Sequence, residues 1–149
     1  MSQVLELYKS TGNEVFSKMI AEAAPYFSTI EPVFKELRPG YAELGFPNQK
    51  KVHNHIGTVH AIAMCNAAEL VAGTMTDVSI PGGHRWIPVA MSVKYLAMAK
   101  TDLRAVADGS HIDWNREGDI DVPVTLYDTD GQAVFTAVIT MKVSRKKKA

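Results

Sequence analysis

The hydrophobic residues of the chain follow two periods, and each predicts a different kind of element. Over residues 2–24, apolar residues recur every three or four positions, which predicts two short helices or one helix broken near Gly12. A second, central helix is predicted over residues 58–76, where small and apolar side chains occupy almost every position. Because this helix lacks a polar face, other elements must cover most of it.

Alternating polar and apolar residues predict strands in the rest of the chain. The predicted strands cover residues 30–37, 41–46, 85–98, 103–112, 122–127 and 133–143. Turn-forming residues between the first two and between the last two favour hairpins, and Pro88 predicts a bulge or an exposed edge. A sheet that curls around the apolar helix satisfies this order, so we predict an α+β hotdog fold, a curved antiparallel sheet wrapped around a long central helix.

Length and composition predict one domain over residues 1–149, because the chain is long enough for a single core. The 16 basic and 16 acidic residues balance, so we expect no nucleic-acid partner. The apolar run 59–78 contains Asn66, Glu69 and Asp77, which favours a buried helix and no membrane. A single cysteine and the lack of a leader sequence favour a cytoplasmic protein.

Glu69 is the residue of the central helix that its surroundings do not explain. On a helical wheel its face carries Ile62, Cys65 and Gly73 but no cation. A carboxylate in this setting needs donors from another segment or subunit, which is typical of a general base or a nucleophile. The alternative is a helix ridge at the surface that leaves Glu69 solvated.

The residues before this helix form a second candidate site. Gly57 gives the backbone freedom there, and Thr58 is the expected cap of the first turn. The amides of His60 and Ala61 then lack partners within the helix and are placed to hold the oxyanion that forms when a thioester is attacked. Asn54 either positions the carbonyl or the water, or simply stabilises the turn while His60 satisfies a carbonyl.

Metal binding and cysteine chemistry are weaker interpretations. His53 and His55 would point to opposite sides of an extended segment, and no Cys or His pair, with His84 included, completes a zinc pattern. Cys65 lies in an apolar helix without an adjacent base, where a thiol usually behaves as a small hydrophobe. We therefore expect no metal site.

Two basic features are candidates for binding phosphate groups, including those of coenzyme A. The tail over residues 145–149 carries four consecutive cations, although terminal charge runs are usually solvated. Arg85 follows a Gly-Gly-His turn and is our tentative contact for a coenzyme A phosphate.

The motif Asn54-x-x-Gly57-x-x-His60, followed on the helix by Glu69, resembles that of the PaaI-like hotdog acyl-CoA thioesterases. The wider stretch 53–66, together with the later Arg-Trp-Ile-Pro, is similar to the uncharacterised hotdog family DUF4442, and the similarity extends over nearly the whole chain. Three positions depart from the PaaI-like pattern. Ala61-Ile62 replace the usual Gly-Gly, Glu69 replaces the usual Asp, and Pro88 stands where some members carry Ser or Thr.

The resemblance implies a homodimer or a dimer of dimers, a homotetramer, with active sites between protomers. Glu69 of one chain would be the nucleophile or general base. The other chain would supply Asn54 to orient water or substrate, the Ala61 amide as oxyanion donor and His60 to shape the helix start. No separate cofactor is implied, because coenzyme A is part of the substrate.

Three functions stay open at this level. The leading hypothesis is hydrolysis of an acyl-CoA thioester to the free acid and coenzyme A. A hotdog dehydratase or hydratase also pairs a histidine with a helix carboxylate, but its usual Pro-Gly signature at the helix start is missing. A non-catalytic acyl-thioester binding protein is favoured if Ala61-Ile62 close the site. The acyl group is not specified, since the pocket depends on how two protomers meet.

Overall fold

The computed structural model describes residues 2–147, so Lys148 and Ala149 of the basic tail lie outside the described residues. The helices are α1 Gln3–Ala23 and α2 Ala61–Ser79, with short 3-10 helices η1 Pro25–Ile30 and η2 Lys50–Val52. The strands are β1 Val33–Arg38, β2 Tyr41–Phe46, β3 His84–Tyr95, β4 Leu103–Asp108, β5 Gly118–Tyr127 and β6 Ala133–Arg145.

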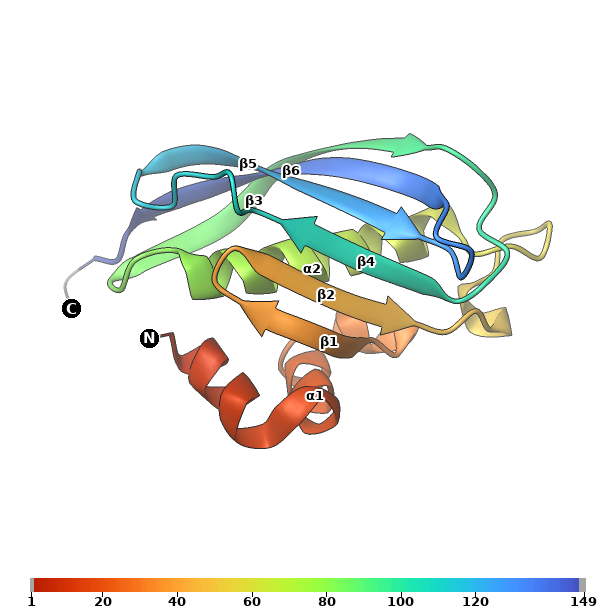
Figure 1. Ribbon diagram of the computed structural model, residues 1–149, viewed down its shortest axis with the longest axis horizontal. Coiled ribbons are helices and arrows are strands. Elements are labelled where there is room, and N and C mark those ends of the chain that lie inside the picture. The colour runs from red at the N-terminus through yellow and green to blue at the C-terminus, as the bar shows by residue number, and fades with distance from the viewer. Residues whose placement is uncertain (1, 148–149) are drawn as a thin grey trace.

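The six strands form one antiparallel sheet in the order β1-β2-β4-β5-β6-β3. The sheet curves around α2, which lies along its concave side (Figure 1). Most residues of α2 from Met64 to Val78 are buried, as expected of a helix without a polar face. This arrangement confirms the predicted α+β hotdog fold.

The core forms between α2 and the inward side chains of the strands. On β6, Phe135, Ile139 and Met141 are at most 1% exposed and face α2, while Val138 on the other face is 43% exposed. Burying each large side chain contributes about 1.5–3 kcal/mol. The outer face of the sheet is thus open to solvent around Val138, whereas Val134 near its end is fully buried.

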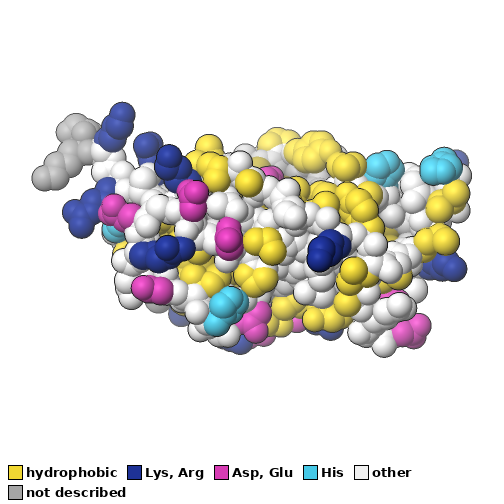
Figure 2. Space-filling view, turned by 90° about the horizontal axis from the view of Figure 1, so that it is seen from above, with side chains coloured by type: hydrophobic (Ala, Val, Ile, Leu, Met, Phe, Trp, Pro, Cys, Tyr) yellow, Lys and Arg dark blue, Asp and Glu magenta, His cyan; other side chains and the backbone are white. Residues whose placement is uncertain are grey.

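β3 is an edge strand whose free side is unusually apolar. It pairs only with β6, and the register shifts between Pro88 and Ala90, which confirms the predicted bulge. Large apolar side chains on and just after this strand are more than two-fifths exposed: Ile87, Val89, Met91, Tyr95, Leu96 and Met98. Hydrophobic side chains gather along one margin of the face seen in Figure 2. Edges of this kind are ordinarily protected by charge or by a partner.

α1 and η1 lie on the side of α2 that the sheet leaves open (Figure 1). α1 is broken at Gly12, which has φ 82° and ψ 176°, so the second half of α1 turns toward the sheet. There the ring of Phe16 packs edge to face on that of Phe34, with centroids 5.1 Å apart. Asn66 of α2 donates through Nδ2 to the carbonyl oxygen of Tyr26 at 3.2 Å, which fastens η1 to the central helix.

Five of the six predicted strands have ends that the structure moves; the fifth begins at Gly118 instead of residue 122, and the sixth ends at Arg145 instead of residue 143. The first begins at Val33, because the preceding residues form η1 after Pro25. The third ends at Tyr95, where the amide of Leu96 turns to the carbonyl of Val134. The fourth ends at Asp108, whose carboxylate accepts a hydrogen bond from a backbone amide two residues later. Within residues 2–147, no helix is long and apolar enough to cross a membrane.

Candidate active site

The loop that leads into α2 is built around the side chain of Asn54. Its Oδ1 accepts hydrogen bonds from the amides of Ile56 and Thr58, both at 3.1 Å, and its Nδ2 donates to Thr58 Oγ1 at 2.8 Å. Gly57 has φ 82°, in the left-handed region where a side chain would be strained. Asn54 therefore stabilises the turn, and the second proton of its amide group lies outside these bonds.

His60, and not Thr58, caps the central helix. Its Nδ1 accepts a hydrogen bond from the amide of Ile62 at 3.0 Å, and α2 begins at Ala61 instead of residue 58. Thr58 is buried, and its hydroxyl instead receives the bond from Asn54. Because Nδ1 is the acceptor, the proton of a neutral His60 ring lies on Nε2.

The two amides expected to hold an oxyanion differ in the structure. The amide of His60 donates to the carbonyl oxygen of Val52 at 2.7 Å, so that part of the prediction is wrong. The amide of Ala61 donates no hydrogen bond to any residue within 2–147 and lies at the positive end of α2. Of the two predicted donors, the Ala61 amide is therefore the free one beside the loop.

Asn54 and Ala61 line the same hollow, which has a volume of about 360 Å³. Residues at and just after the C-terminal end of β3 close this hollow, among them Tyr95 and Met98. The structure thus brings Asn54 and Ala61 together next to the free edge strand, and the turn at Gly57 lies between them in the chain.

Glu69 lies in a different cavity, also of about 360 Å³, between α1, η1, α2 and β3. It is half-buried, and the ion pairs within residues 2–147 involve other side chains. Its neighbours in the lining are mostly apolar: Val4, Ile20, Phe27, Leu70, Trp86 and Pro88. Glu69 is therefore neither a fully solvated ridge residue nor a paired one.

The two halves of the predicted site do not meet within one chain. Ala61 and Glu69 are eight residues apart on α2, which corresponds to about 12 Å along the helix axis. A reacting carbonyl must lie about 3 Å from both an oxyanion donor and a nucleophile. One chain therefore holds the two parts of the predicted site in separate places.

The cysteine and the histidines are accounted for by ordinary structure. Burial raises the pKa of the Cys65 thiol, and a hydrogen bond with Tyr95 opposes that rise in part, so the thiol stays neutral. His53 Nε2 lies 2.6 Å from Asn48 Oδ1, and His55 is exposed. No group of three or more His, Cys, Asp or Glu within residues 2–147 is arranged to hold a metal ion.

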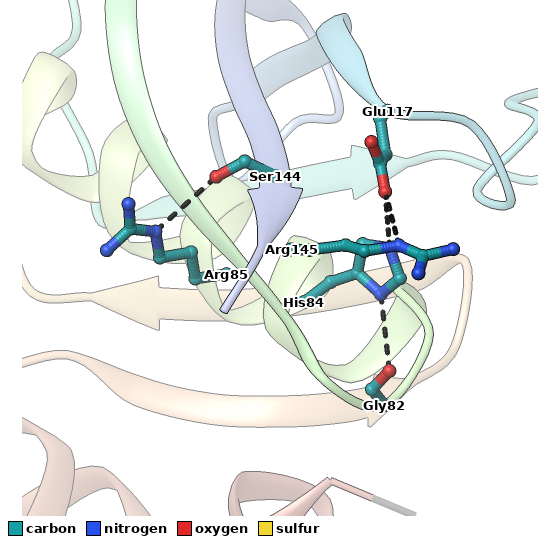
Figure 3. A network of polar contacts seen from close by, with 6 residues as sticks. All are labelled: Gly82, His84, Arg85, Glu117, Ser144 and Arg145. Atoms are coloured by element: carbon teal, nitrogen blue, oxygen red, sulfur yellow. Dashed lines mark hydrogen bonds and ion pairs between the residues drawn. The ribbon is translucent and has the colours of Figure 1, made fainter. Parts of the chain in front are cut away.

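Arg85 is the second residue of β3, and its side chain lies on the opposite side of the strand ribbon from His84, Glu117 and Arg145 (Figure 3). His84 and Arg145 bond to one carboxylate oxygen of Glu117 at 3.1 and 3.0 Å, and they hold the pKa of that carboxyl below its usual value. Arg85 donates only through Nε, to Ser144 Oγ at 3.4 Å, so its exposed terminal nitrogens can reach an anion.

Sequence reasoning missed the residues that enclose Glu69. Trp86 lies against Gly73, where an added Cβ would come within 2.7 Å of the indole ring, and its Nε1 donates to Asp77 Oδ1 at 3.0 Å. Phe27 of η1 closes another side of the same cavity. A glycine on the Glu69 face of the helix was the available signal, but nothing local in the sequence says which aromatic ring fills the space.

Comparisons with known proteins agree with this architecture. A family model described as "Domain of unknown function (DUF4442)" matches residues 12–143. A crystal structure of a genomics target is 60% identical, with 97% of each chain covered and a TM-score of 0.89. No curated protein matches the chain.

More distant solved structures share the fold. A thioesterase family protein from Silicibacter pomeroyi is 19% identical, with a TM-score of 0.75, and the match covers 87% of this chain and 96% of that one. A thioesterase from Haemophilus influenzae is 12% identical, with a TM-score of 0.72 and coverage of 80% and 82%. At these identities the similarity shows a common fold and leaves the chemistry to be argued from the residues.

Proposed function

The chain belongs to the DUF4442 family, and we propose that it is a thioesterase that hydrolyses an acyl-CoA thioester to the free acid and coenzyme A. The observation that carries the proposal is Glu69, a half-buried carboxylate that lines an apolar cavity. Burying a carboxylate among apolar side chains lowers the stability of the fold, and carboxylates in such surroundings are typical of reactive sites. Water activated by Glu69, or Glu69 itself, attacks the thioester carbonyl.

The start of α2 supplies the complementary half of the reaction. The free Ala61 amide, aligned with the helix dipole, stabilises the negative charge that develops on the carbonyl oxygen. The remaining amide proton of Asn54 orients the water or the carbonyl, while Gly57 and His60 hold the loop and the helix start in place. The thiolate of coenzyme A leaves when the tetrahedral intermediate collapses.

A second copy of the chain brings the two halves together in this proposal. The Ala61 hollow adjoins the C-terminal end of β3, and the Glu69 cavity adjoins its N-terminal half through Trp86 and Pro88. Antiparallel pairing of two β3 edges sets the end of one strand beside the start of the other. The Ala61 half of one protomer then faces the Glu69 half of its partner, with two identical sites per dimer.

The same pairing gives Arg85 a role that supports our tentative phosphate contact. Arg85 lies near the N-terminal end of β3, so in an antiparallel dimer it would lie near the partner's loop and helix start, where coenzyme A would enter. Whether two such dimers associate further into a tetramer depends on the open outer face of the sheet. We also propose a cytoplasmic location, which fits a chain with a single, unoxidised cysteine.

Thiol release from a panel of short, medium, long and aryl acyl-CoAs tests the function. We expect turnover of at least one member, and Glu69→Gln should lower kcat by about a hundredfold or more, since it removes the base or nucleophile while keeping the volume of the side chain. Glu14→Gln is the matched control, because Glu14 is an exposed carboxylate on α1. Equal loss in both variants would argue against a special role for Glu69.

The panel also separates the alternatives. Acyl-CoA binding without thiol release from any member would favour a non-catalytic binding protein. Reversible addition of water to an enoyl-CoA, measured as a loss of ultraviolet absorbance without release of free thiol, would favour a dehydratase or hydratase. Either result would overturn the thioesterase proposal.

A further inference from the structure

The indole ring of Trp86 forms one wall of the apolar cavity beside Glu69. We propose that Trp86 sets the length of the acyl group, so that the chain accepts acyl groups of about six carbons or fewer and excludes long fatty acyl chains. This inference rests on the proposed thioesterase function, in which the acyl group enters the cavity that Glu69 lines.

Two contacts fix the position of the ring. Gly73 has no side chain, and a Cβ built there would lie 2.7 Å from Trp86 Cη2 and 3.3 Å from Cζ3, so the indole packs directly on the helix backbone. Its Nε1 donates to Asp77 Oδ1 at 3.0 Å, one turn further along α2. A half-buried tryptophan that is held at both ends cannot swing aside without losing the hydrogen bond.

A second hollow adjoins the Glu69 cavity at Val4 and Asp77, and its lining is more polar. It has a volume of about 660 Å³ and shares only Val4 and Asp77 with the Glu69 cavity. Its other lining includes the polar or charged residues Ser2, Gln3, Lys9, His84 and Lys146. Asp77, which accepts the hydrogen bond from Trp86, therefore lies between an apolar cavity and a hollow of mixed polar and apolar lining, and an apolar chain that passes it leaves an apolar lining for a partly polar one.

The spacing along α2 gives the length limit. Gly73 follows Glu69 by four residues, which places the ring about 6 Å further along the helix axis. An extended chain advances about 3.5 Å over three bonds, so about five bonds fit beyond a carbonyl held at Glu69. A volume of about 360 Å³ is also near the lower end of ligand pockets, which span about 300–1,000 Å³.

Binding of S-alkyl-CoA thioethers of increasing length, measured by calorimetry, tests this limit without any hydrolysis. In the unaltered protein, affinity should rise about fourfold for each added methylene up to about six carbons, and then level off or fall. In Trp86→Ala the rise should continue, so that the preference for a ten-carbon over a six-carbon thioether increases at least tenfold. Trp86→Leu, which keeps an apolar side chain of moderate size, should lie between the two.

Trp114→Phe is the matched control. Trp114 is also half-buried and also donates through Nε1, to the carbonyl oxygen of Gly109 at 3.1 Å, but it lies outside the cavity. Its length profile should equal that of the unaltered protein. Length profiles that coincide for folded Trp86→Ala, Trp86→Leu and the control would overturn the inference, as would affinity that keeps rising to long chains in the unaltered protein.

The two proposals fail in different ways. A chain that binds thioethers with the expected length limit but releases no thiol would refute hydrolysis and keep the role of Trp86. Hydrolysis of acyl-CoA with no effect of Trp86 on chain length would refute the present inference and keep the function.

Discussion

Mixing two inactive variants distinguishes a site shared between protomers from a site within one chain. Glu69→Gln removes the carboxylate. Ala61→Pro removes the amide proton proposed to hold the oxyanion, and it does so at the first residue of a helix, where proline is well tolerated. His60, the residue before it, has φ −64° and ψ 140°, the extended conformation that proline requires of its predecessor. Both variants should therefore fold.

Each variant alone should be nearly inactive. Loss of one oxyanion donor costs about 10²- to 10³-fold in kcat, and loss of a general base costs a similar amount. When the two chains assemble at random in equal amounts, about half of the dimers contain one of each. One site of such a dimer carries both defects, and the other joins an intact Ala61 half to an intact Glu69.

The expected activity of the mixture is therefore about a quarter of that of the unaltered protein, far above either variant alone. The assay is thiol release after co-expression with two different affinity tags, with native mass spectrometry to count the mixed dimers. A mixture that contains the mixed dimers and yet has no more activity than its parts would refute the shared site. In that case each site would carry one defect, as it must if Ala61 and Glu69 of one chain act together across about 12 Å.

Three further predictions concern the edge strand, a half-buried phenol and a crowded glycine. Met91→Lys should convert the proposed dimer to a monomer in analytical ultracentrifugation. Val138→Lys is the control, because Val138 is 43% exposed, against 42% for Met91, but lies on the outer face of the sheet; it should leave the β3 pairing intact. Burial first, and then the hydrogen bond to Glu43, raise the pKa of Tyr41 to about 12. Because the folded protein holds this proton more tightly, the stabilisation is complete below pH 10 and is lost as pH rises toward 12, and Tyr41→Phe should remove that part of the slope in unfolding experiments across this range. Gly109→Ala would place a Cβ 2.7 Å from a tryptophan ring and should lower the free energy of unfolding by about 1–3 kcal/mol in urea.

The fold could be predicted because its signals are local and consistent. A helix with no polar face requires cover on most sides, and alternating strands with turn residues between them supply a sheet that curls around it. The bulge between Pro88 and Ala90 agrees with the missing amide proton of proline, which removes one donor from the hydrogen-bond ladder. Such features need no knowledge of distant contacts.

The helix start shows where local reasoning stops. Thr58 and His60 both carry side chains able to accept from a first-turn amide, and threonine is the more common cap. The choice depends on Asn54, which takes the Thr58 hydroxyl, and on Val52, whose carbonyl takes the His60 amide. Both contacts lie within the loop 52–60 and depend on its folded shape, which side-chain preference for the cap position does not describe, so the error of three residues in the start of α2 has a physical cause.

The walls of the Glu69 cavity lay further beyond the reach of the sequence. Trp86 of β3 lies against Gly73 of α2, and β3 is held there by its pairing with β6. Phe27 reaches the cavity because Asn66 fastens η1 to the helix. Each contact joins residues of different elements, and no sequence pattern around one residue indicates which other residue it will contact.

The lone carboxylate and the bare edge strand have a common explanation. In an isolated chain, Glu69 would be a polar group half-buried for no gain, and the exposed apolar side chains of β3 would invite aggregation. In the proposed dimer, pairing of two β3 edges would bury these apolar side chains, and the same two-fold operation would bring the free Ala61 amide of one chain toward the Glu69 of the other. An interface that only stabilised the protein would not require the site halves to lie at opposite ends of one strand, whereas a shared active site does.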